Sequence, residues 1–158
     1  EGFYDDLLFH RVMQNFMIQG GDPTSKDAPS GVSLGSSGPG YTINPEIGFP
    51  HFRGALAAAR TPGPPQTTPS SGSQFYLVHG QPVSDDMLNG IESRYNFKYS
   101  PEQRAFYKEV GGRPDLDMNY TVYGEIVSGM EVVDKIATVS VNQANRPLED
   151  VKMRIRLK

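Results

Sequence analysis

The sequence predicts a mainly β domain, a closed β-barrel with peripheral helices, on three observations. The chain has 158 residues, which is the length of one domain. It contains 17 glycines and 13 prolines, which favours many turns and short strands over a helical bundle. Its apolar residues form many short stretches, whereas helix start signals are few.

The strands are expected in short apolar segments separated by turn-forming residues. Residues 7–12 and 16–19 should form a hairpin, because the Gln14-Asn15 pair between them is polar and turn-forming. Residues 54–60 are rich in alanine, which prefers helix, but small side chains in a short segment also suit a strand beneath bulky neighbours. Residues 151–158 alternate apolar and basic side chains, as a half-buried strand does. Further strands are expected at residues 41–43, 74–79 and 120–127.

Residues 81–114 carry two helix signals and form an insertion within the domain. Ser84 is placed to cap a helix over residues 85–95. Ser100 and Gln103 form a capping box with a proline between them, which indicates a second helix start. The insertion is either a packing appendage or a lid that narrows the choice of substrate.

A third helix is expected near the C-terminal end of the chain. Ser128 and Glu131 have the spacing of a second capping box. Val132, Val133 and Ile136 follow and would form the inner face of this helix.

Composition excludes several classes of function. Fifteen basic and 18 acidic residues give a net charge of -3, so nothing favours binding to nucleic acid or to an anionic membrane. No apolar run approaches the roughly 20 residues that span a bilayer. The absence of cysteine excludes disulfides, thiol catalysis and cysteine metal ligands. His10, His51 and His79 lack metal-ligand spacing, so we expect neither a metal nor another cofactor.

Residues 9–22 combine a cation, an amide and large apolar side chains. Arg11 and Gln19 are eight positions apart, so on one continuous strand they would share a face. In a hairpin, too, both would lie beside Phe16 and Met17. Such a surface suits an uncharged, partly apolar ligand with one carbonyl to bind, and a peptide has these properties.

A recognisable pattern runs through four stretches of the chain. They are Phe9-His10-Arg11-Val12 with Asn15-Phe16-Met17-Ile18-Gln19-Gly20-Gly21-Asp22-Pro23, then Gly38-Pro39-Gly40-Tyr41, then Ser71-Gly72-Ser73-Gln74-Phe75-Tyr76, and Val122-Tyr123-Gly124-Glu125-Ile126. In order and approximate spacing these stretches resemble the cyclophilin family of peptidyl-prolyl cis-trans isomerases. The resemblance spans nearly the whole chain apart from residues 81–114, and the long loops are most like a bacterial branch.

The resemblance implies an eight-stranded antiparallel barrel capped by two helices. In the family the counterpart of Glu1 follows two strands and a helix, so this chain is expected to supply most of the barrel, with the completing segment elsewhere. It also implies isomerisation of X-Pro bonds in polypeptide partners, assistance to protein folding, and a monomer when complete. The compartment is left open between the bacterial cytoplasm and the periplasm or envelope, with a preference for the latter.

The chemistry of the family needs only a well-placed cation. An X-Pro amide resists rotation, with a barrier of ~18–20 kcal/mol, because the nitrogen lone pair is delocalised into the carbonyl. In the twisted transition state the nitrogen regains its lone pair, so a donor aimed at it stabilises that state more than the planar one. The resemblance implies that Arg11 is this electrostatic catalyst. Gln19 would hold the backbone carbonyl of the substrate and orient Arg11.

The binding residues of the family carry over to nine further positions. The resemblance implies a proline pocket formed by Phe16, Met17, Tyr76, Leu116 and Tyr120. It implies an adjoining groove, for residues before the proline, formed by Ala59, Arg60, Thr61 and Gln74. Either Gly35 or Gly38 would allow a close approach of the substrate backbone.

Two positions depart from the family or from the site. Asp115 stands where the family commonly has an aromatic residue that its cyclic-peptide inhibitor uses, so we expect weak inhibition. His10 neighbours Arg11 and is expected to face the opposite way, as a packed, hydrogen-bonded core histidine. The rival hypothesis is a binding module that holds proline-containing partners without turnover; Asp115 and the insertion favour it, whereas Arg11 and Gln19 count against it.

Overall fold

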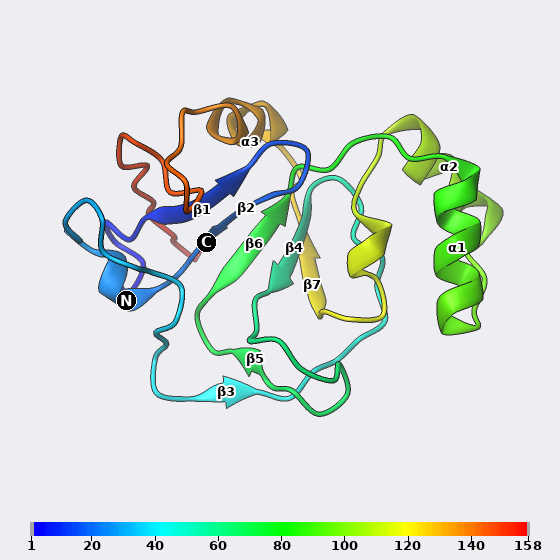
Figure 1. The fold of residues 1–158 in the computed structure, drawn as a ribbon, viewed down its shortest axis with the longest axis horizontal. Coiled ribbons are helices and arrows are strands. Elements are labelled where there is room, and N and C mark those ends of the chain that lie inside the picture. Colours follow the sequence, from blue (N-terminus) through cyan, green and yellow to red (C-terminus); the bar gives the residue numbers. More distant parts are fainter. Residues whose placement is uncertain (1, 158) are drawn as a thin grey trace.

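A computed structural model describes residues 2–157 and shows an open antiparallel sheet in the strand order β1-β2-β6-β4-β7, with a small β3–β5 ribbon below it in Figure 1. The strands are β1 (Phe9–Met13), β2 (Met17–Gly20), β3 (Thr42–Ile43), β4 (Ala55–Ala58), β5 (Ser70–Ser71), β6 (Phe75–Val78) and β7 (Val122–Glu125). The helices are α1 (Asp85–Tyr95), α2 (Pro101–Glu109) and α3 (Met130–Ala137), with short 3-10 turns η1 (Pro23–Ser25) and η2 (Pro114–Leu116). A mainly β fold is confirmed. The closed barrel is not, because within residues 2–157 the outer strands β1 and β7 lie at opposite ends of the sheet and do not pair.

The predicted hairpin is present as β1 and β2, and it contains a bulge. Asn15 in its turn has φ of 60°, a conformation that asparagine tolerates better than most residues. Arg11 pairs with Gln19, whereas Phe9 pairs with Gly20, so two steps along β1 match one step along β2. The extra residue is His10. A bulge of this kind interrupts the alternation of side chains between the two sides of a strand.

The sheet separates two apolar clusters. On β6, Phe75 and Tyr76 point to opposite sides, as successive strand residues do. The α3-side core contains Leu7, Phe9, Val12, Ile18, Phe75, Val133, Ala137 and Met153. The open-side cluster contains Met17, Ala55, Ala57, Ala59, Tyr76 and Val78. Helix α3 covers the first side, as Figure 1 shows, and the second side carries the small alanines of β4.

The predicted start and inner face of α3 need correction. The N-cap is Gly129, with φ of 89°, and no side chain caps the helix, so the predicted capping box at Ser128 is wrong. Ser128 stands one residue before the cap position. Val133 is buried, but Val132 is 52% exposed. Neighbouring positions on a helix lie about 100° apart, so a face centred on the buried Val133 and Ala137 leaves Val132 outside.

The predicted C-terminal strand forms only at its start. The backbone N–H of Phe9 donates to Val151 at 2.9 Å, and that of Met153 donates to Leu7 at 2.9 Å. Beyond Met153 the chain leaves β1, and Leu157 is fully exposed. The apolar residues after Met153 are exposed, because among residues 2–157 no strand continues alongside them. Glu1 and Lys158, named in the sequence expectations, lie outside the described residues.

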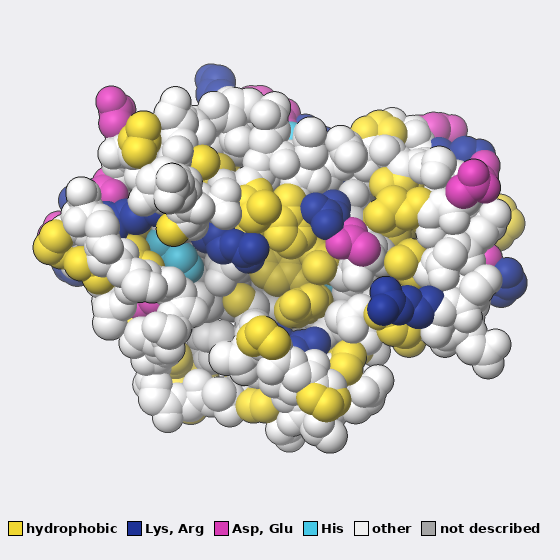
Figure 2. Space-filling view, viewed as in Figure 1, with side chains coloured by type: hydrophobic (Ala, Val, Ile, Leu, Met, Phe, Trp, Pro, Cys, Tyr) yellow, Lys and Arg dark blue, Asp and Glu magenta, His cyan; other side chains and the backbone are white. Residues whose placement is uncertain are grey.

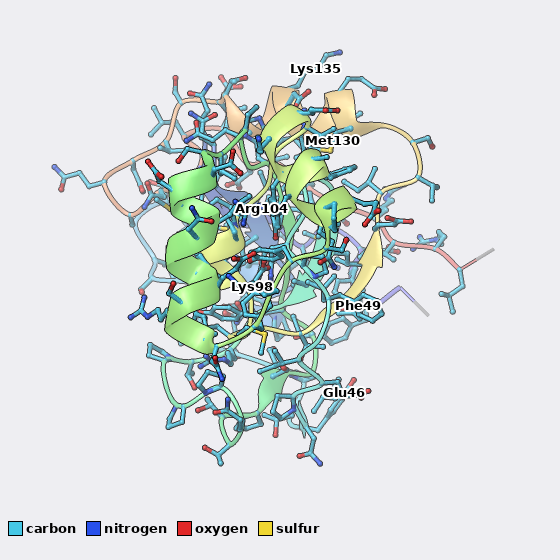
Figure 3. All side chains as sticks on the ribbon, turned by 90° about the vertical axis from the view of Figure 1, so that its right-hand side faces the viewer. Glu46, Phe49, Lys98, Arg104, Met130 and Lys135 are labelled. Carbon is cyan, nitrogen blue, oxygen red and sulfur yellow. The ribbon has the colours of Figure 1, made fainter. Side chains whose placement is uncertain are left out.

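The insertion folds as the local signals indicate. Ser100 and Gln103 make both hydrogen bonds of the capping box at the start of α2. Leu88, Ile91, Tyr99 and Tyr107 form a small apolar cluster of their own. Arg104 lies between α1 and α2, as Figure 3 shows, and donates to Glu92 at 2.9 Å and to Asp85 at 2.7 Å. Among residues 2–157, no helix combines the length and the apolar character that crossing a membrane requires.

Candidate active site

A cavity of about 560 Å³ opens on the side of the sheet that carries the open-side cluster. Figure 2 shows this face of the molecule hollowed at its centre, where hydrophobic side chains lie between Lys or Arg side chains. Nine of the predicted site residues line the cavity. They are Arg11, Phe16, Met17, Gln19, Ala59, Arg60, Tyr76, Leu116 and Tyr120.

A second depression of about 370 Å³ adjoins the cavity. It contains Thr61 and Gln74, the two remaining predicted residues, and it shares Gln19 with the cavity. Gly35 lines both depressions, whereas Gly38 lines only the second. The structure therefore brings all the predicted site residues together along one continuous trough.

A row of polar side chains connects the two depressions. Arg11 Nη1 donates to Gln19 Oε1 at 3.4 Å, which is a long contact, and Gln19 Nε2 donates to Gln74 Oε1 at 3.1 Å. Gln74 Nε2 donates in turn to the backbone carbonyl of Ser37 at 2.7 Å. This row directs the amide oxygen of Gln19 toward Arg11. One N–H of the Gln19 amide is left for another acceptor, because an amide nitrogen carries two hydrogens.

Phe16 lies between two guanidinium groups. The Cζ atom of Arg11 is 5.7 Å from its ring centroid, and that of Arg113 is 4.0 Å away. Asp115 holds Arg113 with two hydrogen bonds of 2.7 and 2.6 Å, in the bidentate geometry that suits this pair. An ion pair thus stands at the position where the family resemblance implies an aromatic residue. Arg113 was not predicted, and its spacing of two from Asp115 is the only sequence signal.

Tyr76 contributes its ring to the cavity and its hydroxyl to the interior. The ring lies edge-on to that of Tyr120, with centroids 5.9 Å apart, and its hydroxyl is 2.9 Å from Nε2 of His51. Burial, and after it the neighbouring Tyr120, raises the pKa of Tyr76 well above its ordinary value. The hydroxyl therefore stays protonated, and the ring presents an uncharged surface to the cavity.

The side chain of Arg60 donates hydrogen bonds to nearby backbone carbonyls. Its Nε donates to the carbonyl of Asn119 at 3.1 Å, and its Nη1 donates to the carbonyls of Thr61 and Gly63 at 2.9 and 3.0 Å. Its guanidinium also lies 4.6 Å from the ring centroid of Tyr120. The side chain therefore shapes the trough wall.

The family model described as cyclophilin type peptidyl-prolyl cis-trans isomerase matches residues 1–156. The chain belongs to this family. A relative from Staphylococcus aureus strain USA300 is 36% identical over 152 residues, which are 95% of this chain and 71% of the relative. A relative from Staphylococcus haemolyticus strain JCSC1435 is also 36% identical over 152 residues, 95% of this chain and 70% of its own. Both relatives carry the name "Putative peptidyl-prolyl cis-trans isomerase".

Solved structures agree on the cyclophilin fold. A crystal structure of a cyclophilin type isomerase from Cryptosporidium parvum superposes with a TM-score of 0.61 at 20% identity, and covers 96% of this chain and 72% of that one. The structure of the same protein in the presence of the dipeptide Ala-Pro has a TM-score of 0.60. The predicted family is confirmed, the chain is a peptidyl-prolyl cis-trans isomerase, and the rival binding module is not favoured.

His10 differs from its predicted place in this cyclophilin. It is buried, 4% exposed, but it lines the same cavity as Arg11. Neither ring nitrogen has a hydrogen-bond partner among residues 2–157, so the predicted burial of His10 is confirmed, whereas the predicted hydrogen bond and the predicted orientation away from the cavity are wrong. The bulge explains this, because it places two consecutive residues on one side. Burial lowers the pKa of His10, which favours the neutral imidazole.

Asp22 holds the loop that closes one end of the cyclophilin cavity. Its buried carboxylate accepts from the backbone N–H groups of Thr24 at 2.8 Å and Gly35 at 2.6 Å. Gly35 has φ of 99°, and a side chain there would begin 3.2 Å from Nε2 of His10. Burial raises the pKa of Asp22, but the hydrogen bonds from Thr24 and Gly35 outweigh it, and the net pKa is lowered.

Three cavity residues near the C-terminal end were also not predicted. Asn142, Ala144 and Arg146 come from the loop after α3. Arg146 is tied to the carbonyls of Ala28 and Pro29 at 2.8 and 2.9 Å, so it joins two distant loops. No motif marks these residues, because the fold alone brings them to the site. Within the described range, no group of three His, Asp or Glu side chains is arranged to hold a metal ion.

Proposed function

We propose that this cyclophilin accelerates rotation about X-Pro bonds in flexible polypeptides, and so assists protein folding, with Arg11 as the electrostatic catalyst. The observation that carries the proposal is the position of Arg11. Its guanidinium lines an apolar cavity beside Phe16, and its long contact with Gln19 is its only side-chain hydrogen bond among residues 2–157. Most of its N–H groups are therefore free to donate to a substrate.

The proline ring would enter the cavity between large apolar side chains. Met17 and Tyr76 are buried beneath it, and Phe16 and Leu116 flank them. The ring stays in place while the acyl group rotates. As the amide twists, its nitrogen becomes basic, and an N–H of Arg11 donates to it. No nucleophile or proton transfer is needed, since the barrier falls when the twisted state alone gains this hydrogen bond.

The trough beside Arg11 would bind the chain that precedes the proline. Gln19 has one free amide N–H for the backbone carbonyl of the substrate, because the other donates to Gln74. Arg60 and Thr61 offer backbone groups along the same side, whereas the N–H and carbonyl of Ala59 already pair with Gln74 and Ser71, so Ala59 would contribute its small side chain. The Ala-Pro dipeptide used with the Cryptosporidium parvum protein supports a proline-containing ligand for this family member as well.

The test is an NMR exchange or protease-coupled assay on a proline peptide. We expect Arg11→Ala to lower kcat/KM by about 10²–10³, as loss of a transition-state donor does. Arg156→Ala is the matched control, because Arg156 pairs with Asp5 and lies outside the cavity. Equal rates for the wild type and Arg11→Ala would overturn the assignment. Peptide binding by the wild type without faster exchange would favour the rival binding module.

We also propose that the open sheet belongs to a closed eight-stranded barrel, as a monomer, and that residues 81–114 are an insertion in a single domain. The outer edge of β7, which pairs with no other strand among residues 2–157, supports closure, and Tyr123 on β7 is 57% exposed. The separate apolar cluster of the insertion supports the second point. Amide hydrogen exchange tests the barrel: outward-facing N–H groups of β7 should be protected when further strands pair with it. Rapid exchange at these groups in the functional protein would contradict closure.

A further inference from the structure

A buried carboxylate joins the helical insertion to the floor of the cavity. Asp117 is 3% exposed and accepts four hydrogen bonds. Its Oδ1 accepts from the backbone N–H of His51 at 2.7 Å and lies 2.8 Å from Nδ1 of the same residue. Its Oδ2 accepts from the hydroxyls of Tyr99 at 2.5 Å and Tyr107 at 2.6 Å. Both tyrosines belong to the insertion, Tyr99 in the link between α1 and α2 and Tyr107 in α2, so these two segments meet at this one group.

The hydrogen bonds continue from Asp117 to Tyr76. An ionised carboxylate only accepts, so Nδ1 of His51 carries a hydrogen. The other ring nitrogen then exchanges a hydrogen bond of 2.9 Å with the hydroxyl of Tyr76. The imidazole also stacks near the Tyr76 ring, with centroids 6.0 Å apart and planes within 12°. The side chain of His51 is fully buried.

The two insertion tyrosines are permanent donors. Burial, and after it the charge of Asp117, raises the pKa of both Tyr99 and Tyr107 far above the ordinary tyrosine value. Their hydroxyls therefore keep their hydrogens. Tyr107 is wholly buried and Tyr99 nearly so, which leaves water little room to replace either donor.

A second connection runs from the insertion to the cavity wall. Asn119 Nδ2 is 2.7 Å from the hydroxyl of Tyr95, at the end of α1, and it donates to the carbonyl of Asp117 at 2.9 Å. The carbonyl of Asn119 accepts from Arg60, whose guanidinium lies over Tyr120. The insertion is thus connected by hydrogen bonds to His51, which contacts Tyr76, and through Asn119 to Arg60, which contacts Tyr120.

Packing from β4 leaves the ring of Tyr76 room to tilt. Its partner across the sheet on β4 is Ala57, and the neighbouring residues of the same cluster are Ala55 on β4 and Ala59 just after it. Methyl groups leave space for a ring to tilt, whereas a buried hydroxyl must keep its partner or lose a hydrogen bond. The contact with His51 therefore adds a directional restraint to the edge-on packing against Tyr120.

We propose that Asp117 and His51 are positioning residues for the proline pocket, and that Tyr99 and Tyr107 of the insertion set the orientation of Tyr76 through them. The insertion is then neither a detached appendage nor a lid, because it acts on the pocket from beneath. This inference rests on the proposed function, which gives Tyr76 its role as the pocket floor. Because the proline ring occupies the pocket in the ground state and in the transition state alike, the effect should fall on KM.

The test compares Tyr99→Phe/Tyr107→Phe with Tyr123→Phe. The double variant keeps both rings and removes the two hydroxyls from Asp117, while Tyr123 is an exposed β7 tyrosine outside the connection. We expect the double variant to raise KM, and the Kd for a proline tetrapeptide in an NMR titration, about 10-fold, with kcat within twofold of the wild type. The aromatic NMR resonances of Tyr76 should shift in the double variant and stay unchanged in Tyr123→Phe. Circular dichroism checks that each variant is folded at the assay temperature.

The possible outcomes are separable. A folded double variant with wild-type KM and unmoved Tyr76 resonances would overturn the inference, and so would a fall in kcat at constant KM. If the double variant does not fold, each single variant must show a smaller rise in KM together with a shift of the Tyr76 resonances, and wild-type values in both singles overturn it. Failure of the proposed function would appear elsewhere, as an unchanged kcat in Arg11→Ala.

Discussion

Side chains alternate between the two sides of the central sheet, but one side is a covered core and the other is an open cavity. On the α3-side core, Phe75, Phe9 and Ile18 are buried in one cluster with Val133 and Ala137 of α3. On the open side, the alanines of β4 lie opposite Met17 and Tyr76, and a cavity of about 560 Å³ remains. The difference teaches that the cavity forms where β4 contributes small side chains and where, among residues 2–157, no helix covers the sheet as α3 does on the other side. We therefore expect a side chain to contribute mainly to stability on one side and mainly to ligand binding on the other.

The sharpest test of this contrast is Phe75→Ala. Phe75 is 7% exposed and contacts the rings of Tyr4 and Phe9 edge-on. We expect a loss of about 3–5 kcal/mol in the free energy of unfolding, because the deleted ring leaves a cavity that the closed side cannot fill. Urea denaturation measures this directly. A loss below about 1 kcal/mol would show that the α3-side core is as loosely filled as the open side.

The matched change on the open side is Phe16→Ala. Phe16 is only partly buried and lies at the edge of the cavity. We expect KM for a proline peptide to rise by about 10-fold or more, the equivalent of about 1.5–3 kcal/mol of lost apolar contact. The free energy of unfolding should change by less than about 1 kcal/mol. The contrast between the two sides fails if Phe16→Ala destabilises the protein as much as Phe75→Ala does.

The smallest expected effect concerns the loop that closes the open side. The pKa of Asp22 in the folded protein is lowered, so its ionised form is the one that folding favours. Its contribution to stability is therefore present above the unfolded pKa of about 3.9 and is lost as the pH falls through the folded value. We expect Asp22→Asn to lose about 1 kcal/mol at pH 7 and to show a shallower decline in stability between about pH 5 and pH 2.

Urea midpoints across that pH range give the measurement, and the difference between the two proteins is the quantity of interest. Other carboxyls, such as Asp85 and Glu92, also have lowered pKa values and contribute equally to both curves. Parallel curves for the wild type and Asp22→Asn would show that the loop does not depend on this charge.

Local signals predicted the parts of the fold that depend on local chemistry. The caps at Ser84 and Ser100 placed the starts of α1 and α2 correctly, because capping hydrogen bonds join residues three positions apart. The residues assigned to the site also gather along one trough, since the motif that carries Arg11 and Gln19 forms a single hairpin. Whether these residues play their assigned roles is a matter for the kinetic tests above.

Features that depend on distant contacts were not predictable. The alternation after Met153 resembles a strand, but in the part of the chain that the structure describes no other strand continues beside it. Arg146 and Asp117 are held by contacts with residues far away in the sequence, and no sequence spacing predicts these contacts. Sheet closure likewise depends on pairing between strand edges, which the alternation within each strand does not specify.

The bulge in β1 has a consequence for the volume of the site. Phe9 and Val12 are three positions apart, yet both enter the α3-side core, while Arg11 between them faces the cavity. In an evenly alternating strand with Arg11 in the cavity, Phe9 would occupy the cavity too, and His10 would face the core. The bulge thus places the imidazole of His10, and not the larger ring of Phe9, at the cavity wall. Deleting His10, the bulged residue, would restore even alternation with Phe9 in the core and Arg11 in the cavity, and would remove the imidazole from the cavity wall.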